Sequence, residues 1–214
     1  MRQAARLLLP LILPAALLLL TSSSPATAQE PRAERPTYCL GDKWIRSDGV
    51  WDLIRIEEDL YVFAAEGDRE IHLTRDLALA KGIRGGTVEW EFDPPPQLKW
   101  PLEVGKWGIS TTNIRTVRGE IINPLHGNKL SVTWKVEAYE DVQVTGGTFK
   151  AFRVAYSWQL PGGGGSIGQP SPNWTLSTWY APEVRQIVKG ESDRPWFPSF
   201  QVVAVGRPGP CPSR

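Results

Sequence analysis

The chain has 214 residues, of which 22% are charged and 10% aromatic, and its formal net charge at pH 7 is +1. A charge balance this close to neutral gives no electrostatic reason to expect a nucleic acid or an anionic membrane as a partner. The length suits one domain of ordinary size.

Residues 1–28 have the features of a secretory signal peptide. Arg2 and Arg6 give a positive start, residues 7–20 form an apolar run, and Ala26-Thr27-Ala28 offers a cleavage pattern of small residues. The apolar run has 14 residues and contains two prolines, so it is short for the roughly 20 residues of a membrane span. We therefore expect cleavage, no membrane span afterwards, and a periplasmic or secreted product.

Two cysteines, Cys39 and Cys211, lie near the two ends of the exported chain. In an oxidising compartment a disulfide bond between them is the favoured expectation, and two separate thiols are the alternative. The chain-entropy model gives the closure of so long a loop about 4–5 kcal/mol of stabilisation. Cys39 lies too far beyond the apolar run to be a lipoprotein acylation site.

Residues 29–38 are polar and rich in proline, and we expect them to form a flexible lead-in. Residues 39–211 then alternate short runs of β-branched and aromatic residues with turn signals such as Asp48-Gly49, which predicts one β domain. A first sub-sheet, 39–93, ends at Asp93-Pro94-Pro95-Pro96 because proline cannot donate to a β-ladder. Its expected strands are 41–45, 50–56, 60–64, 70–74, 77–80 and 87–92.

The second sub-sheet, residues 97–206, is organised around a long hairpin at 129–158. Both arms alternate apolar and polar residues around Gly146-Gly147, and a glycine pair supplies the positive φ of a tight turn. Residues 161–172 are rich in glycine and proline and predict a flexible loop. The other expected strands are 108–117, 174–180, 184–189 and 200–205. We therefore predict about ten antiparallel strands in a single all-β domain, forming a twisted open barrel or sandwich.

Several motifs follow one another in a familiar order. They are Gly41-Asp42-Lys43-Trp44, residues 100–107 (WPLEVGKW), residues 140–151 (EDVQVTGGTFKA) and Trp179-Tyr180-Ala181-Pro182. In these motifs the chain resembles a group of exported bacterial proteins of unknown function, some of which are similar to the half-open β-barrels that carry lipoproteins. The resemblance implies a β-barrel fold and carries over no activity. Thr145-Gly146 replaces the Pro-Ala that is usual in the group.

Candidate catalytic residues are few. The two histidines are His72, in an expected strand, and His126, in an expected loop. There is no Gly-x-Ser-x-Gly elbow and no His or Cys spacing typical of a metal site. Glu89 and Glu91 share one face of a strand and could pair as in glycoside hydrolases, but surface carboxylates are the commoner explanation. We therefore expect no catalytic residue, no metal site and no cofactor.

The unusual feature of the composition is tryptophan, which occurs ten times. Trp44, Trp107 and Trp134 are expected in the core, together with Leu102, Val104 and Phe149. A second set could line a ligand-binding concavity, since an indole offers apolar area and one N–H donor: Trp100, Trp158, Trp174 and Trp196. The alternative is that these rings merely fill the concave face of a curled sheet.

Three functions are compatible with these features. The first is a non-enzymatic exported protein that binds an apolar or amphipathic ligand (a lipid, glycan or peptide) in a Trp-lined concavity. The second is a structural or assembly partner that contacts another envelope protein. The third is a hydrolase of envelope glycan or ester that uses His72 or His126 with an acid.

Overall fold

The computed structural model describes residues 30–116, 129–159, 173–193 and 199–206. The predicted signal peptide, the predicted loop at 161–172, His126, Trp196 and Cys211 lie outside these residues. Every regular element in the described part of the chain is a β-strand, which confirms the predicted all-β class. The described residues contain no helix long and apolar enough to cross a membrane.

The strands have the following bounds: β1 (Arg32–Ala33), β2 (Lys43–Arg46), β3 (Gly49–Ile56), β4 (Leu60–Ala64), β5 (Arg69–Thr74), β6 (Leu79–Arg84), β7 (Thr87–Asp93), β8 (Leu102–Glu103), β9 (Trp107–Thr116), β10 (Lys129–Val144), β11 (Gly147–Gln159), β12 (Asn173–Ala181), β13 (Gln186–Ser192) and β14 (Phe200–Val205).

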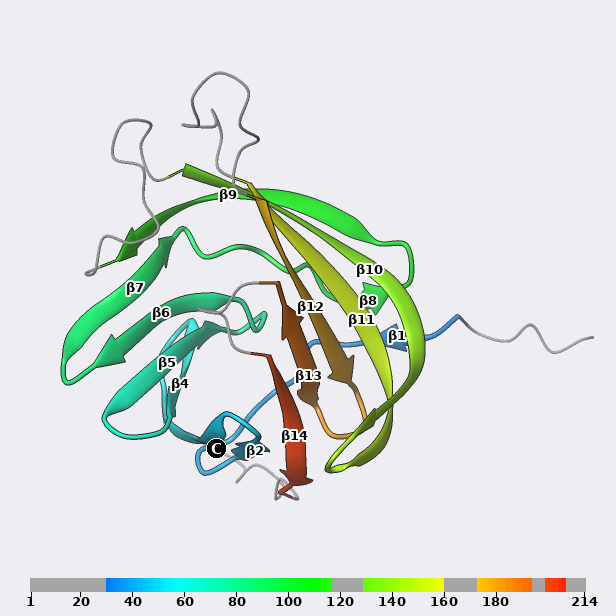
Figure 1. The fold of residues 1–214 in the computed structure, drawn as a ribbon, viewed down its shortest axis with the longest axis horizontal. Helices are drawn as coiled ribbons and strands as arrows, with labels where there is room; N and C mark the ends of the chain where they lie inside the picture. Colours follow the sequence, from blue (N-terminus) through cyan, green and yellow to red (C-terminus); the bar gives the residue numbers. More distant parts are fainter. Residues whose placement is uncertain (1–29, 117–128, 160–172, 194–198, 207–214) are drawn as a thin grey trace, which may run out of the picture.

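Twelve of these strands form a closed barrel in the order β10-β11-β12-β13-β14-β2-β3-β4-β5-β6-β7-β9, and all neighbours are antiparallel (Figure 1). β7 pairs with β9 across the proline-rich segment, with Phe92 opposite Ile114. The two predicted sub-sheets are therefore joined directly, and the ring of strands is closed where the prediction left it open.

The long hairpin of β10 and β11 confirms the organising element of the prediction. Its pairing runs from Ser131 opposite Gln159 to Val144 opposite Gly147, which has a φ of +135°. A β-bulge shifts the register between Val136 and Ala138, and a bulge bends the strand that carries it. Beyond the bulge, the tip curls towards β14 (Figure 1), where the Gly146 N–H donates to the Val202 carbonyl at 2.9 Å.

Glycine makes room for aromatic rings on the inner face of the barrel. Gly82 lies opposite Trp90, Gly108 opposite Trp134, and Gly190 opposite Phe200. A Cβ atom on Gly82 would lie 2.5 Å from the Trp90 ring, and one on Gly108 would lie 2.7 Å from the Trp134 ring. In each pair the missing side chain lets the ring lie flat against the neighbouring strand, so the interior is filled by large side chains.

The predicted flexible lead-in contains a packed segment. β1 pairs with β8 through Ala33 and Leu102, and both side chains are buried. Tyr38 belongs to the same core cluster, and its hydroxyl donates to the Arg185 carbonyl. The N-terminal segment therefore packs against the core, although its composition is that of a mobile terminus.

The predictions for the core have mixed outcomes. Trp44 and Trp134 are each 1% exposed, and Leu102 and Phe149 are buried, as predicted. The same prediction is wrong for Trp107 and Val104, which are 63% and 48% exposed. Gly108 takes the inward position beneath Trp134, so the preceding Trp107 must face outward. Val104 lies in the turn between β8 and β9.

Cys39 is buried and is not a free thiol. Its predicted partner, Cys211, lies outside the described residues. The Cys39–Cys211 disulfide therefore stays a prediction.

Candidate functional site

The tryptophans proposed to line a concavity fall into separate clusters. Trp158 and Trp174 lie opposite each other on β11 and β12, and their rings stack with centroids 5.9 Å apart and an interplanar angle of 7°. Both are buried with Phe92 and Leu130. Trp100 is half-buried against the main core, where its indole N–H donates to the Asp76 carbonyl at 3.1 Å. Of the three that lie in the described part of the chain, the structure brings two together, and the role of all four as a ligand site stays a prediction.

Two polar atoms near this stack have no hydrogen-bond partner among the residues that the structure describes. They are Nε1 of Trp158 and Oγ of Ser110, both of which are buried. Val132 lies between them, because it pairs with Ser110 on β9 and with Trp158 on β11. A buried polar group without a partner costs about 1–3 kcal/mol. This part of the inner face therefore has unused hydrogen-bonding capacity.

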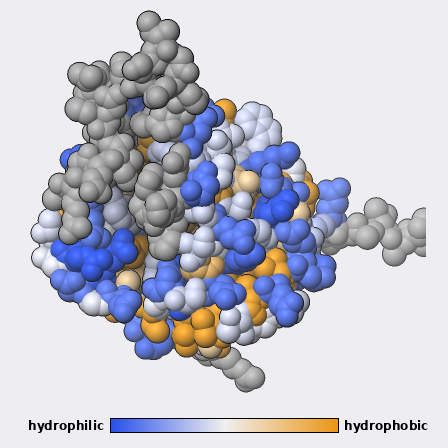
Figure 2. Space-filling model, in the orientation of Figure 1, coloured by the Kyte–Doolittle hydropathy of each residue, from blue (hydrophilic) through white to orange (hydrophobic). Residues whose placement is uncertain are grey.

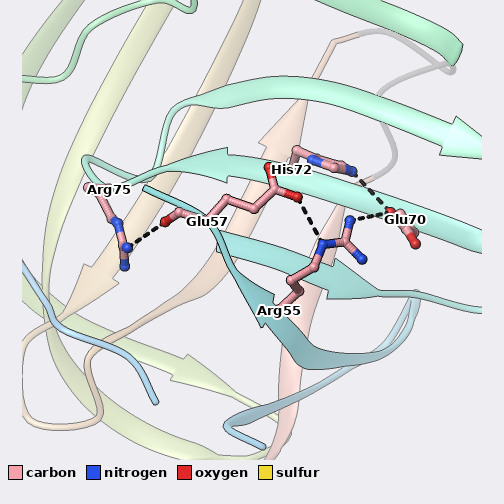
Figure 3. Close-up of polar contacts among 5 residues, drawn as sticks. All are labelled: Arg55, Glu57, Glu70, His72 and Arg75. Atoms are coloured by element: carbon pink, nitrogen blue, oxygen red, sulfur yellow. Dashed lines mark hydrogen bonds and ion pairs between the residues drawn. The ribbon is translucent and has the colours of Figure 1, made fainter. Parts of the chain in front are cut away.

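His72 lies on the outer face of β5 and is 2% exposed. Figure 3 shows it beside Glu70, whose carboxylate also faces Arg55. The Nε2 atom of His72 is 3.1 Å from Oε2 of Glu70, and the Arg55 guanidinium donates to that oxygen at 3.2 Å. Burial lowers the pKa of His72, and the hydrogen bond to Glu70 opposes this effect.

The remaining contacts of this cluster are an ion pair and a hydrogen bond to a backbone carbonyl. Arg55 donates to Oε1 of Glu57 at 2.8 Å, and Arg75 donates to the Glu57 carbonyl at 2.7 Å (Figure 3). Glu70 is shared between His72 and Arg55, and the hydrogen-bond partners of His72 within the described ranges include no serine or cysteine that it could activate. The geometry is that of a charge network that ties β3 to β5.

The two candidate glycosidase carboxylates are likewise paired with arginines. Glu89 lies 3.1 Å from Arg69 and 2.8 Å from Arg84, and Glu91 forms an ion pair with Arg115 on β9. Both carboxylates are thus occupied by ion pairs with arginines rather than facing each other across a cleft as a catalytic pair would. Among the described residues, no group of three or more His, Cys, Asp or Glu could hold a metal ion.

Register places further charges on the same side of the barrel. Arg55, Val62, His72, Lys81, Glu91 and Arg115 occupy one row across β3, β4, β5, β6, β7 and β9. We call this outer surface the charged face and define it by seven residues: Arg55, Glu57, Glu70, His72, Lys81, Glu91 and Arg115.

The outer surface of β9 to β12 is different. Its register gives three rows of four outward positions, listed from β9 to β12: Trp107, Lys135, Ala155 and Ser177; Ile109, Thr133, Ser157 and Thr175; Thr111, Ser131, Gln159 and Asn173. We call these twelve residues the hydroxyl face. Lys135 is the single charged residue among them, and six of the twelve carry a hydroxyl group.

One corner of the hydroxyl face is apolar. Trp107 and Ile109 are 63% and 61% exposed and project from the same side of β9, and the turn residue Val104 precedes them. Sequence reasoning placed Trp107 and Val104 in the core and so missed this surface. The available signal was Gly108, because a glycine beside a tryptophan in a strand can mark the inward position.

A second set of exposed apolar residues lies near β2 and β14. Val50 and Val203 are more than one-third exposed, and Val50 pairs with Ile45. Figure 2 shows apolar side chains gathered at the lower edge of the view, where Figure 1 places β2 and β14. No aromatic residue projects there among the described exposed hydrophobics, in contrast to Trp107.

Comparison with known proteins identifies no family. No family model matches the chain, and no curated protein matches it. Two solved structures are similar at 10% identity and a TM-score of 0.45. One is the hypothetical lipoprotein YmcC from Escherichia coli, with 79% of this chain and 90% of that chain covered. The other, provisionally assigned as a lipoprotein, is from Parabacteroides distasonis, with 80% and 98% covered.

At this identity and TM-score, neither likeness establishes ancestry or function. What the fold itself defines is an antiparallel β-barrel protein with a filled aromatic interior and two outer faces of contrasting chemistry.

Proposed function

We propose that this protein is a non-enzymatic exported binding protein whose barrel is a scaffold and whose partner contacts the outer surface around Trp107. The exposure of Trp107 beside Ile109 carries this proposal. An exposed indole can bury a large apolar area on contact, and tryptophan is enriched among residues that dominate binding energy. The signal-like segment at residues 1–28 supports export.

The non-enzymatic part of the proposal is supported by the pairing of the candidate catalytic groups. His72 is enclosed beside Glu70, and both Glu89 and Glu91 face arginines. A catalytic acid or base has to reach a substrate, and it has to hold or release its proton near the working pH. None of these three side chains is placed in that way.

The experiment is sedimentation of the purified exported chain with cell-envelope material of its source. A double variant, Val104→Ser with Ile109→Ser, removes the apolar residues beside Trp107. We expect it to weaken binding about tenfold. Each buried CH₂ contributes about 0.8 kcal/mol, so the loss of two apolar side chains exceeds the roughly 1.4 kcal/mol that corresponds to a tenfold change in affinity.

A matched control is available on another strand. Val50→Ser with Ile54→Ser changes the same two residue types at positions that are 44% and 46% exposed. The control should sediment like the unmodified protein. Equal loss in both doubles, or no sedimentation of the unmodified protein, would contradict the proposal.

A ligand held inside the barrel is a second candidate, and the unpartnered atoms of Trp158 and Ser110 favour it. Ligand oxygens on the inner side of Val132 could accept from the indole N–H and from the hydroxyl. Native mass spectrometry of protein purified from the periplasm tests this candidate. A bound lipid or oligosaccharide that Trp158→Phe with Ser110→Ala releases would support it, and a clean apo mass would reject it.

A further inference from the structure

The hydroxyl face is a compact array of neutral hydrogen-bonding groups. Neighbouring strands lie about 4.8 Å apart and alternate residues about 6.7 Å apart along a strand, so three rows of four residues cover about 14 by 13 Å. Gln159 and Asn173 add side-chain amides to the six hydroxyls. All twelve residues are exposed or half-buried.

The fold does not require this composition. Outward positions of the same barrel carry seven charged or titratable residues on the charged face. Solubility is served better by charge than by serine and threonine. The scarcity of charge on the hydroxyl face is therefore not imposed by the fold, and it restricts the classes of partner that this surface can bind.

The chemistry of the face discriminates between classes of partner. One lysine, Lys135, is too little for a polyanion, which needs several phosphate contacts. Serine and alanine are depleted in protein interfaces, whereas Ser131, Ser157, Ser177 and Ala155 lie on this face. The hydrocarbon region of a lipid bilayer would leave the hydroxyls and amides without partners.

A neutral sugar chain fits the scarcity of charge, the small side chains and the hydroxyl and amide groups of this face. Its hydroxyl groups both donate and accept, as do the Ser and Thr hydroxyls of rows two and three. The apolar side of a sugar ring can lie on the Trp107 indole, which is 63% exposed. Short side chains let an extended chain approach the sheet closely along a row.

We infer that the hydroxyl face binds a neutral, extended polysaccharide, with Trp107 as the stacking platform and Thr133 and Ser157 at the centre of the contact. This inference rests on the proposed function and names the substrate class of the same site. It differs from the interior candidate, because every residue that it uses faces away from the barrel core.

The experiment measures binding of the exported chain to insoluble cellulose and chitin and to envelope material before and after protease digestion. We expect binding to at least one of the two polysaccharides, and protease-resistant binding to the envelope. Trp107→Ala should weaken both about tenfold, and Ser157→Lys should do the same by placing a long charged side chain at the centre of the face.

Val50→Lys is the matched control, since it adds the same charge to an exposed position outside the hydroxyl face. It should bind like the unmodified chain. Circular dichroism and the urea midpoint of each variant show whether it has folded.

The outcomes separate this inference from the proposed function. Envelope binding that depends on Trp107 but is abolished by protease, with no binding to either polysaccharide, overturns the glycan inference and leaves a protein partner. Polysaccharide binding that survives both Trp107→Ala and Ser157→Lys overturns it too. If the chain binds no envelope material and no polysaccharide, both fail.

Discussion

The charged face and the hydroxyl face are built on the same barrel and differ only in their outward residues. Beneath the charged face, Gly82 accommodates Trp90, and beneath the hydroxyl face Gly108 accommodates Trp134. The same glycine–tryptophan packing thus lies beneath both faces. The charged face nevertheless carries a network of ion pairs, whereas the hydroxyl face carries one charge.

The difference shows which residues the fold constrains. Inward side chains must fill a fixed volume, so their size is determined by the neighbours across the barrel. Outward side chains need only tolerate water, which leaves their chemistry open to function. A contrast between two outer faces is therefore more informative about function than any pattern in the core.

The largest expected effect is a loss of stability on removing the partner of a charge inside the barrel, compared with removing a carboxylate from the charged face. The Arg46 guanidinium is buried between two aromatic rings, with its Cζ atom 3.4 Å from the ring centroid of Phe200 and 3.9 Å from that of Trp51. It also donates to both carboxylate oxygens of Asp48, at 2.8 and 2.6 Å. Asp48→Ala leaves this charge unpaired and should lower the free energy of unfolding by about 3–5 kcal/mol.

Urea denaturation checks this value. Glu57→Ala on the charged face is the comparison, because it removes a carboxylate from an exposed arginine pair. If both variants shift the midpoint equally, the distinction between interior and surface charge is wrong.

The second prediction compares the interior under the two faces. Gly108→Val and Gly82→Val each drive a side chain into a tryptophan ring and should destabilise by about 1–3 kcal/mol. Gly108→Val should have the larger effect, because Trp134 is fully buried whereas Trp90 is half-buried and can move aside. Thermal midpoints of the two variants measure the order, and the reverse order would contradict the account of the packing.

The third prediction concerns pH and belongs to the charged face alone. Burial lowers the pKa of His72 in the folded chain below its ordinary value of 6.5. The folded state then binds fewer protons than the unfolded state. The contribution of His72 to the free energy of unfolding is therefore complete above about pH 6.5 and is lost as pH falls through the folded pKa. One such group contributes a slope of at most about 1.4 kcal/mol per pH unit.

The measurement is urea unfolding at pH 7.5 and 5.5 for the unmodified chain and for His72→Asn. The variant should lose less stability between the two pH values. The charged groups that face His72 are Glu57, Glu70 and Lys81; they and His126 are unchanged in the variant, so their contributions largely cancel. Equal losses would show that His72 does not titrate differently on folding.

The smallest expected effects are on the two outer surfaces themselves. Arg55→Ala removes two exposed ion pairs and should cost about 0.2–1 kcal/mol, less in 1 M salt, because exposed pairs are screened. Ser157→Ala should change stability by less than about 0.5 kcal/mol at any salt concentration. A large effect of Ser157→Ala on stability would mean that the hydroxyl face is structural.

The predicted strands agree with the structure where local patterns are strong. The run 60–64 is β4, and a tight turn at Thr145-Gly146, directly before Gly147, joins β10 to β11. β1 and β8 were not expected, because each has two residues and lies beside prolines that indicate irregular structure. Their pairing depends on partners that are far apart in the sequence: Arg32 lies opposite Glu103, and Ala33 opposite Leu102.

The functional surface was less accessible to sequence reasoning. Alternation assigns two faces to each strand but does not say which face is covered or which strands are neighbours. Trp158 and Trp174 were predicted to be among the residues that line a ligand site, which stays a prediction; that their rings stack on each other follows only from the register of β11 and β12. The hydroxyl face exists as a surface only through the pairing of four strands.

The sequence by itself determined the all-β class, the long hairpin and most strand bounds, because these depend on β-branched and aromatic alternation and on glycine turns within a few residues. Tertiary structure decided the closure of the barrel, the outward direction of Trp107 and the grouping of hydroxyls into one face. Those features depend on which strands pair and in what register, and that is decided by packing between residues far apart in the sequence, such as Phe92 against Trp158.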